Sequence, residues 1–390
     1  MIPYGKQYTD ANDVKIVESS ILSKFLTNGK FLKIFEKKIK DNVKSKYSLA
    51  CTNGTSAIYL AFVALNIKKN DVVIMPAINF VACANIASFF GCNIIFADID
   101  IDTGQMSPQT LVECIKKNKL KKISLLITMY MGGHPKNIEE FYKLKNKYKF
   151  KILEDACHAF GSSYKSKYLF NKVGSCKHSD ICAFSFHPLK TITSGEGGCL
   201  TTNNQSFYNT AKVARNHGFD SNNKYHWKYN LKFPSFNFRL NELSCALGVS
   251  QLKKLSFFLK KRNLIAKNYD FLFKNEDIFN KIITTPKINE QKKLRSSWHL
   301  YSIFINFKKL KTNKDQLIKF LLKNKVRVQF HYTPIVNFKH FKKPIRNYPN
   351  ALLYSSSVIS LPIFVLILVR MYIKMNFYWR FLLCLQLKES

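Results

Sequence analysis

The chain of 390 residues is long enough to bury two hydrophobic cores, and its content of 46% hydrophobic and 14% aromatic residues excludes an intrinsically disordered protein. Lys and Arg outnumber Asp and Glu by 62 to 24, which gives a formal net charge of +38. Because the basic residues are spread along the chain and are mostly Lys, we expect no nucleic-acid partner, although a basic surface would attract a small anionic substrate.

The ten cysteines form neither a CxxC pair nor a Cys/His cluster with zinc spacing, so we expect no metal site. Cys51, Cys83, Cys157 and Cys199 lie inside apolar segments, as reduced core cysteines commonly do. The opening MIPYGKQYTD is polar and does not resemble a secretory signal. Together these features predict a protein of the reducing cytoplasm.

Short apolar runs alternate with amphipathic segments from about residue 45 to residue 205. This alternation predicts a mostly parallel sheet with helices on both faces, in which ligands bind beyond the carboxyl ends of the strands. The runs expected as strands are Tyr47–Thr52, Asp71–Pro76, Asn93–Asp98, Ile123–Met129, Phe150–Glu154, Ile181–Phe186 and Gly198–Thr202. The segments expected as helices include Ser56–Leu65, Ser107–Lys117 and Ile138–Tyr148.

The second part of the chain has a different pattern. Helical periodicity dominates from Asn241 to about Asp277, and an α+β segment follows. We therefore expect a large domain at residues 1–255 and a smaller C-terminal domain at residues 256–390.

The tail from Val365 onward is apolar, aromatic and basic. Pro362, Arg370, Lys374 and Arg380 divide this run into pieces shorter than the roughly 20 apolar residues that a membrane-spanning helix needs. We therefore expect an interfacial or core helix here, and no membrane anchor.

Lys190 stands in the segment SFHPLKTITSGEGG, at residues 185–198, shortly after a predicted strand and Pro188. In so basic a chain, a lysine by itself is an ordinary solvated charge. Here the loop is rich in Thr, Ser and Gly, and its glycines allow close approach of the backbone. A lysine that is desolvated in such a loop has a lowered pKa, and its neutral amine can form an imine.

Two acids end the apolar run of ILEDACHAFG, at residues 152–161. Such acids can be no more than the polar lip of a strand. An anionic carboxylate at this place can also keep a pyridine nitrogen protonated, as pyridoxal chemistry requires. Asp155 and Cys157 share one face of an extended segment, so Asp155 could meet the nitrogen while the small Cys157 packs beneath the ring. His158 fits a structural and a catalytic role equally well.

Thr55 and Ser56 open a predicted helix in CTNGTSAIYLAFVAL, at residues 51–65. The first-turn amides of a helix are unpaired donors that attract an anion, so this turn is the expected seat of a cofactor phosphate, although a plain N-cap would use the same residues. Ser185 would add a hydroxyl to this seat. Phe80, in PAINFVACANI, either stacks on the second face of the cofactor ring or is a core phenylalanine.

Taken in order, these motifs resemble those of the DegT/DnrJ/EryC1/StrS family of sugar aminotransferases. The likeness extends from IPYGKQ at residues 2–7 to SLPIF, which ends at residue 364. It implies an α/β protein with the type I PLP-dependent transferase fold, in which a large αβα domain with a mostly parallel sheet precedes a smaller C-terminal α+β domain. Further matching segments are FLTNGKFLKIFE (25–36), DID (98–100), RNHGF (215–219), FNFRLNELSCALGVSQL (236–252), SSWHLYSI (296–303) and VQFHYTPI (328–335).

The resemblance implies pyridoxal 5′-phosphate as cofactor, with Lys190 holding it as a Schiff base and Asp155 on the pyridine nitrogen. Asn237, in FNFR, would reach the cofactor phosphate of the neighbouring subunit, which implies a homodimer. The full set of implied cofactor contacts is Lys190, Asp155, Thr55, Ser56, Phe80, Cys157, His158, Ser185 and Asn237. Substrate contacts would come from Tyr4, from Lys24, Phe25, Leu26 and Thr27, and from His331, Tyr332, Thr333 and Pro334.

Within the family, the segments HPLKTITSGEGG, IPYG and HYTPI are most similar to members of pseudaminic acid synthesis. These members move the amino group of L-glutamate to C4 of a UDP-linked 4-keto-6-deoxy-N-acetyl-hexosamine. Another UDP- or TDP-linked 4-keto sugar is the alternative substrate. A sugar dehydratase of the same fold is disfavoured, because in such enzymes another residue replaces the cofactor lysine.

The chain departs from the family pattern after Phe364. In the family, a Pro-led turn and an amphipathic closing helix follow this point, whereas here the apolar and basic tail begins. We interpret the difference as a frameshift in the gene or its sequence, which leaves a catalytically impaired relative as a further alternative.

Overall fold

The computed structural model describes residues 1–220, 227–274, 281–287 and 293–366. Its centre is a seven-stranded sheet in the order β1-β9-β8-β5-β4-β2-β3. Its strands are β1 (Tyr47–Cys51), β2 (Val72–Pro76), β3 (Asn93–Ala97), β4 (Leu125–Met129), β5 (Lys151–Asp155), β8 (Ile181–Ser185) and β9 (Gly198–Thr202). The sheet is mostly parallel, and β9 runs antiparallel to its neighbours β1 and β8.

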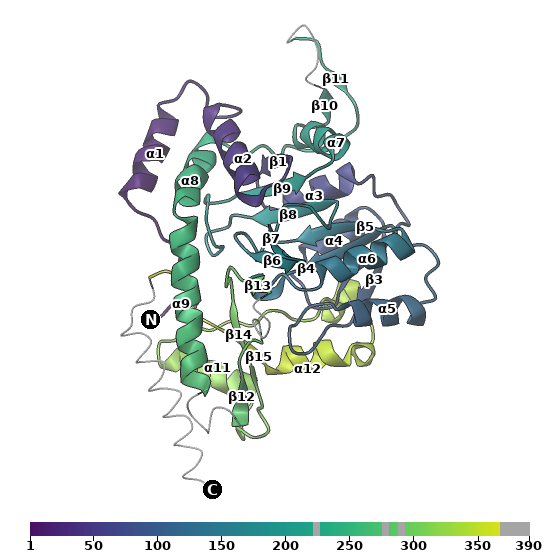
Figure 1. The fold of residues 1–390 in the computed structure, drawn as a ribbon, viewed down its shortest axis with the longest axis vertical. Helices are drawn as coiled ribbons and strands as arrows, with labels where there is room; N and C mark the ends of the chain where they lie inside the picture. The colour runs from purple at the N-terminus through teal and green to yellow at the C-terminus, as the bar shows by residue number, and fades with distance from the viewer. Residues whose placement is uncertain (221–226, 275–280, 288–292, 367–390) are drawn as a thin grey trace.

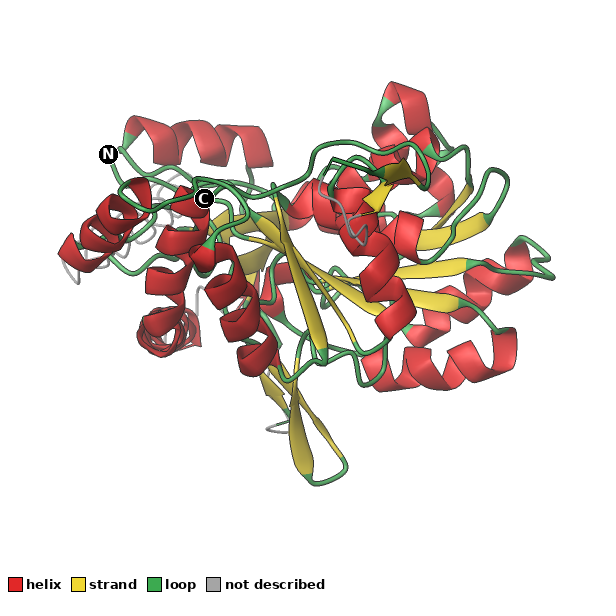
Figure 2. Ribbon diagram, turned by 90° about the horizontal axis from the view of Figure 1, so that it is seen from above, coloured by secondary structure: helices red, strands yellow, loops and turns green. Residues whose placement is uncertain are grey.

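Alternating side chains along these strands build one hydrophobic core on each face of the sheet. In β4, for example, Leu125, Ile127 and Met129 belong to one core and Leu126 to the other. Figures 1 and 2 show the helices that cover the two faces. The first core includes α3 (Gly54–Ala64), α4 (Ala82–Phe89) and α7 (Gln205–Arg215), and the second includes α2 (Lys30–Val43), α5 (Pro108–Lys117), α6 (Ile138–Tyr148) and α8 (Glu242–Lys253).

The sequence predictions for this part of the fold are confirmed. The seven strands coincide with the seven expected runs, and α3, α5 and α6 coincide with the three expected helices, with ends that differ by at most two residues. The helical periodicity expected from Asn241 corresponds to α8 and α9 (Leu255–Lys274), while Asp277 lies outside the described residues.

A second sheet is formed by the C-terminal part of the chain, in the order β12-β14-β15. It has a hydrophobic core of its own, which includes side chains of α9 and α11. The strands are β12 (Ile283–Thr284), β14 (Tyr301–Ile305) and β15 (Val358–Leu361), with α11 (Lys314–Lys323), α12 (Pro349–Ser357) and the 3-10 turns η2 (Ile335–Asn337), η3 (Lys339–Phe341) and η4 (Ile345–Asn347) nearby in the chain.

Smaller elements connect these two parts. A three-stranded sheet has the order β13-β6-β7. In it, β13 (Leu294–Arg295), which follows α9 and β12 in the chain, pairs with β6 (Ser163–Ser166), and β6 pairs with β7 (Leu169–Lys172). The remaining elements are α1 (Ala11–Ile21), η1 (Met131–Gly133) and the hairpin of β10 (Phe219–Asp220) and β11 (Asn230–Leu231).

The N-terminal segment lies across the C-terminal part of the chain. Ile2 forms a parallel bridge with Val326, in which its N–H donates to the carbonyl of Lys325 at 2.6 Å and its carbonyl accepts from the N–H of Arg327 at 3.0 Å. The Ile2 side chain is buried in the core of the second sheet. This anchoring places Tyr4, two residues further on, within reach of His331.

Glu242, at the start of α8, fixes the chain that leads into α2. Its carboxylate accepts hydrogen bonds from the backbone N–H groups of Gly29 at 2.9 Å, Phe31 at 2.6 Å and Leu32 at 3.1 Å. The residue is 0% exposed. Gly29 is required here because a Cβ at this position would lie 2.8 Å from Glu242 Oε2. Glu242 therefore satisfies the otherwise unpaired donors at the start of α2.

We expect Glu242→Ala to lower the free energy of unfolding by roughly 3 kcal/mol, because it leaves three backbone donors without their charged acceptor. Urea denaturation followed by circular dichroism measures the change. The matched control is Glu113→Ala, which removes an exposed carboxylate from α5. Equal stability of the two variants would contradict the prediction.

The expected helix after Val365 falls almost wholly on residues 367–390, which lie outside the described residues. Within the described ranges, no helix is both long and apolar enough to cross a membrane.

Candidate active site

A cavity of about 490 Å³ opens at the carboxyl ends of β4, β5 and β8. This is the edge of the sheet at which the alternating pattern of the sequence predicts a ligand site. The start of α3 and the segment around residue 331 form further walls. The lining residues are Tyr4, Asn53, Gly54, Thr55, Ile58, Asn79, Phe80, Ala82, Met129, Asp155, Cys157, His158, Ser185, His187, Leu189, Lys190, Glu196, His299, His331 and Tyr332.

The first turn of α3 forms one end of this cavity. The side chain of Asn53 caps the helix by accepting a hydrogen bond from the N–H of Ser56 at 2.8 Å. Gly54 follows the cap, and a Cβ there would lie 2.9 Å from Ser185 Cβ and 3.0 Å from Cys157 Sγ. The missing side chain thus lets the helix start approach the ends of β5 and β8 closely, as an anion seat with backbone donors requires.

Ser56 itself does not line the cavity. Its hydroxyl lies 2.9 Å from Asn53 Oδ1 and 2.7 Å from Thr52 Oγ1, and the residue is buried. Thr55, in contrast, is exposed and lines the cavity. Of the two residues that open the helix, Thr55 therefore lines the cavity, while the hydroxyl of Ser56 contacts the cap residue Asn53.

Asp155 is the last residue of β5 and is 4% exposed. Its Oδ1 accepts a hydrogen bond from the N–H of Cys157 at 3.3 Å. Its Oδ2 accepts from Asn79 Nδ2 and from Cys83 Sγ, each at 3.3 Å. The buried carboxylate therefore has hydrogen-bond donors on both oxygens, as a buried polar group requires.

Lys190 follows β8 in a turn whose backbone is closed by the bond from its own N–H to the carbonyl of His187 at 2.9 Å. Its Nζ lies 3.5 Å from His299 Nε2. Burial lowers the pKa of Lys190, while the nearby Cys157 and Asp155 offset part of this effect. Because the charged form is the one that burial disfavours, the amine loses its proton at a lower pH than a solvated lysine does.

Three histidines surround this amine. The rings of His158 and His299 lie 4.2 Å apart between centroids, and His331 is 6.3 Å from His158. Burial, aided by nearby positive charge, lowers the pKa values of His158 and His299 well below the ordinary imidazole value, and burial lowers the pKa of His331 to about 3. All three are therefore neutral near pH 7, and Lys190 has no imidazolium beside it.

Two tyrosines complete this wall. Tyr332 Oη lies 2.9 Å from His158 Nε2, and Tyr4 Oη lies 3.4 Å from His331 Nε2. His331 is also held through its Nδ1, which lies 2.9 Å from Ser360 Oγ in β15. The wall thus combines the N-terminal segment, the loop after β5 and the second sheet.

Most residues expected from the sequence meet in this cavity. Those that line it are Tyr4, Thr55, Phe80, Asp155, Cys157, His158, Ser185, Lys190, His331 and Tyr332. Those that do not are Ser56, Asn237, Lys24, Phe25, Leu26, Thr27, Thr333 and Pro334.

Several lining residues were not expected. Asn79 lies in PAINFVACANI, the segment around Phe80, and His299 lies in the matching segment SSWHLYSI, but neither residue has a predicted role. The N-cap pattern of Asn53 followed by Gly54 and Thr55 was a signal that identifies Asn53. Asn79 and His299 give no such local signal, because their place in the site depends on how distant segments pack.

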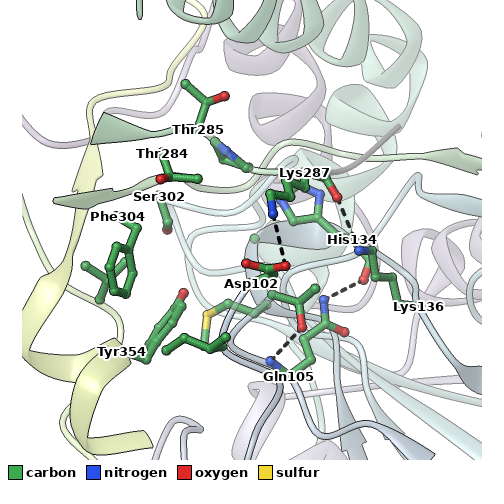
Figure 3. A pocket seen from close by; sticks show the side chains of 16 residues that line it. Asp102, Gln105, His134, Lys136, Thr284, Thr285, Lys287, Ser302, Phe304 and Tyr354 are labelled. Atoms are coloured by element: carbon green, nitrogen blue, oxygen red, sulfur yellow. Dashed lines mark hydrogen bonds and ion pairs between the residues drawn. The ribbon is translucent and has the colours of Figure 1, made fainter. Parts of the chain in front are cut away.

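A second cavity, of about 200 Å³, lies between the loops after β3 and β4 and the second sheet. Figure 3 shows the ion pair of Lys287 with Asp102 at 3.2 Å and the bond from Lys136 Nζ to the carbonyl of Lys287 at 3.2 Å. Its lining shares no residue with the first cavity. Lys287 is exposed and Lys136 is half-buried, and each makes one of the two contacts just named. Neither is therefore a buried amine like Lys190 of the larger cavity.

The larger cavity fits pyridoxal phosphate. It offers an amine with a lowered pKa at Lys190, a carboxylate at Asp155, and a cradle at Gly54 beside the N-terminal turn of α3. These are the three groups that the aldehyde, the ring nitrogen and the phosphate of this cofactor need.

Solved structures place the protein in the class of PLP-dependent aminotransferases. It matches Helicobacter pylori PseC, an aminotransferase involved in the biosynthesis of pseudoaminic acid, with a TM-score of 0.86 and 29% sequence identity over 97% of both chains. The fold is also that of the putative sugar aminotransferase Spr1654 from Streptococcus pneumoniae in its PLP form, with a TM-score of 0.86 at 22% identity over 97% of both chains. Residues 7–368 match the DegT/DnrJ/EryC1/StrS aminotransferase family, and the chain belongs to this family. It is an aminotransferase, and its cofactor is pyridoxal 5′-phosphate.

Curated relatives cover most of the chain. One from Campylobacter jejuni is 36% identical over 343 residues, which are 88% of this chain and 86% of the relative. One from Helicobacter pylori is 32% identical over 349 residues, 89% of this chain and 88% of the relative. Both relatives are named UDP-4-amino-4,6-dideoxy-N-acetyl-beta-L-altrosamine transaminase.

The lowered pKa of Lys190 has a measurable consequence in the cofactor-free protein. Reductive methylation with formaldehyde modifies neutral amines, so Lys190 should reach its half-maximal rate at a lower pH than the exposed lysines of the same sample. Peptide mass spectrometry across a pH series measures both in one experiment. A midpoint for Lys190 at or above that of the exposed lysines would contradict the prediction.

Proposed function

We propose that the protein transfers the amino group of L-glutamate to C4 of a UDP-linked 4-keto-6-deoxy-N-acetyl-hexosamine, the reaction that precedes pseudaminic acid. The observation that carries the reaction class is the desolvated Lys190 amine in one cavity with the buried Asp155 carboxylate. The sugar is supported by the names of the relatives from Campylobacter jejuni and Helicobacter pylori.

When bound, pyridoxal phosphate supplies an aldehyde that takes up amines and a ring that draws electrons from the neighbouring carbon. Lys190 would hold the cofactor in the resting enzyme. Its Nζ would serve as the base that takes the proton from Cα of L-glutamate and as the acid that delivers a proton to C4 of the sugar in the second half-reaction. Asp155 would place its carboxylate against the ring nitrogen.

The remaining cofactor contacts follow from the shape of the cavity. Thr55 and Ser185 supply hydroxyls beside the first-turn amides of α3, so they hold the phosphate, and Ser56 contributes by fixing the cap. Cys157 packs against one ring face and Phe80 against the other, and both line the cavity. His158, neutral and bonded to Tyr332, orients this wall.

The sugar meets the wall formed by Tyr4, His331 and Tyr332, which offers two phenol hydroxyls and a neutral imidazole. Lys24, Phe25, Leu26 and Thr27, together with Thr333 and Pro334, lie outside the lining of the cavity. In this proposal they contact the nucleotide part of the substrate, and the strong net positive charge of the chain favours binding of its diphosphate.

A homodimer completes the site in this proposal. Asn237 lies outside the cavity of its own chain, where it bridges Asn216. Next to it, Phe236 is 51% exposed, and its ring centroid lies 6.3 Å from that of Phe89, which is 67% exposed. An exposed aromatic pair of this kind favours burial against a second subunit, whose phosphate seat Asn237 then reaches.

We expect the purified protein, with L-glutamate and pyridoxal phosphate, to aminate the UDP-linked 4-keto sugar, and Lys190→Ala to abolish turnover while the exposed control Lys177→Arg keeps it. Mass spectrometry and NMR identify the amine, and borohydride should fix the cofactor to Lys190. Unchanged turnover in Lys190→Ala would refute the mechanism. Product from a TDP-linked sugar alone would replace the substrate and leave the reaction class intact.

Mixed dimers test the role of Asn237. Each of Lys190→Ala and Asn237→Ala is expected to be inactive or strongly impaired alone, because one lacks the amine and the other a phosphate contact. Unfolding and refolding an equal mixture should restore about a quarter of wild-type activity, because half of the dimers then carry one intact site of two. A mixture that stays as inactive as its components would contradict a shared site.

Three further points belong to this proposal. We place the boundary between a large part at residues 1–255 and a smaller part at residues 256–390 where the sequence pattern changes.

A cytoplasmic location is supported by the cysteines, because the nine of the ten that lie in the described residues form no disulfide. A catalytically impaired relative is the alternative that the atypical tail raises, and the amination assay distinguishes it.

A further inference from the structure

Two buried side chains that no step of the reaction uses contact the Asp155 carboxylate. Asn79 is 1% exposed and Cys83 is 0% exposed, and each lies 3.3 Å from the same oxygen, Oδ2. Both come from the chain between β2 and the first turn of α4, two strands away from β5 in the sheet order. Their approach therefore depends on the tertiary packing of the strand ends.

The orientation of the Asn79 amide is determined by its second hydrogen bond. Its Oδ1 accepts from the backbone N–H of Phe80 at 2.6 Å, so its Nδ2 is the atom that faces Asp155. One amide thus links the carboxylate to the backbone of Phe80, a lining residue of the cavity.

Cys83 is a donor and not a nucleophile. Burial, reinforced by the negative charge of Asp155, raises the pKa of its thiol well above the ordinary value. The thiol therefore keeps its proton over the working pH range and offers an S–H to Oδ2.

We propose that Cys83 and Asn79 are positioning residues that hold Oδ2 of Asp155 and stabilise its ionised form, so that the carboxylate keeps the cofactor ring nitrogen protonated. The inference rests on the proposed function, in which Asp155 faces that nitrogen.

Other titratable groups face Asp155 and set the background for this effect. Cys157 and Tyr332, whose pKa values burial raises well above the ordinary range, are neutral there. Lys190 is the cation that interacts with Asp155 across the cavity, and in the loaded enzyme its amine is engaged with the cofactor. The two donors on Oδ2, together with the Cys157 N–H on Oδ1, are then the groups that stabilise negative charge on the buried carboxylate.

The test compares Cys83→Ala, Cys83→Ser and the control Cys114→Ala, each loaded with ¹⁵N-labelled pyridoxal phosphate. Cys114 is also a core cysteine, but its thiol donates to the carbonyl of Phe96 and it does not line the cavity. The ¹⁵N chemical shift reports directly whether the ring nitrogen carries a proton, independently of turnover.

At fixed pH, the ¹⁵N shift reports the ratio of complexes with the proton on the ring nitrogen to complexes with the proton on the carboxylate. We expect this ratio to fall about tenfold in Cys83→Ala, because losing a hydrogen bond to the ionised carboxylate makes that carboxylate the better base. Cys83→Ser should recover most of the ratio through its hydroxyl, and Cys114→Ala should show the wild-type ratio. Asn79→Ala should shift the ratio in the same direction as Cys83→Ala.

Melting curves of the cofactor-free variants separate this effect from a loss of packing. Comparable destabilisation in Cys83→Ala and Cys114→Ala, with a changed proton ratio in the first alone, supports the inference. A wild-type ratio in both Cys83→Ala and Asn79→Ala overturns it. If the wild-type protein shows no protonated ring nitrogen at all, the proposed role of Asp155 fails, which is a different outcome.

Discussion

The desolvation of one amine is the constraint on which the rest of the site depends. Lys190 lies in a cavity where burial lowers its pKa, and the nearby Cys157 and Asp155 offset only part of this effect. The three nearby histidines are neutral because they are themselves buried, so none of them adds a positive charge. Asp155 adds a buried carboxylate to the same cavity, with hydrogen-bond donors on both of its oxygens. Polar groups can be buried this close together only because each is uncharged or has hydrogen-bond partners.

The topology of the sheet explains how these groups come together. Parallel strands bring their carboxyl ends to one edge, so Met129, Asp155 and Ser185 meet although they are distant in sequence. The absence of a side chain at Gly54 lets α3 start against two of these strand ends. Glu242, by contrast, acts far from the cavity, yet it fixes the entry to α2 against α8 and so stabilises the large part as a whole.

Sequence reasoning identified the elements and the chemistry of this edge well, because both leave local signals. Strand periodicity placed the seven strands. Glu154 and Asp155 end β5, and Lys190 lies in the loop after β8. It did not identify Asn79, Cys83 or His299, because their roles depend on contacts between segments that are far apart in the chain. The phosphate role of Ser56 stays a prediction, and in this structure its hydroxyl contacts Asn53 and Thr52.

The wall of Tyr4, His331 and Ser360 has a consequence for biogenesis. Its members come from opposite ends of the chain, and Ile2 is held by a bridge to Val326. During synthesis the first turn of α3, which forms one end of the cavity, emerges from the ribosome long before this wall can assemble. A nascent chain therefore exposes a half-built cavity to solvent, and a truncated product would lack the surface that shields the lysine from water.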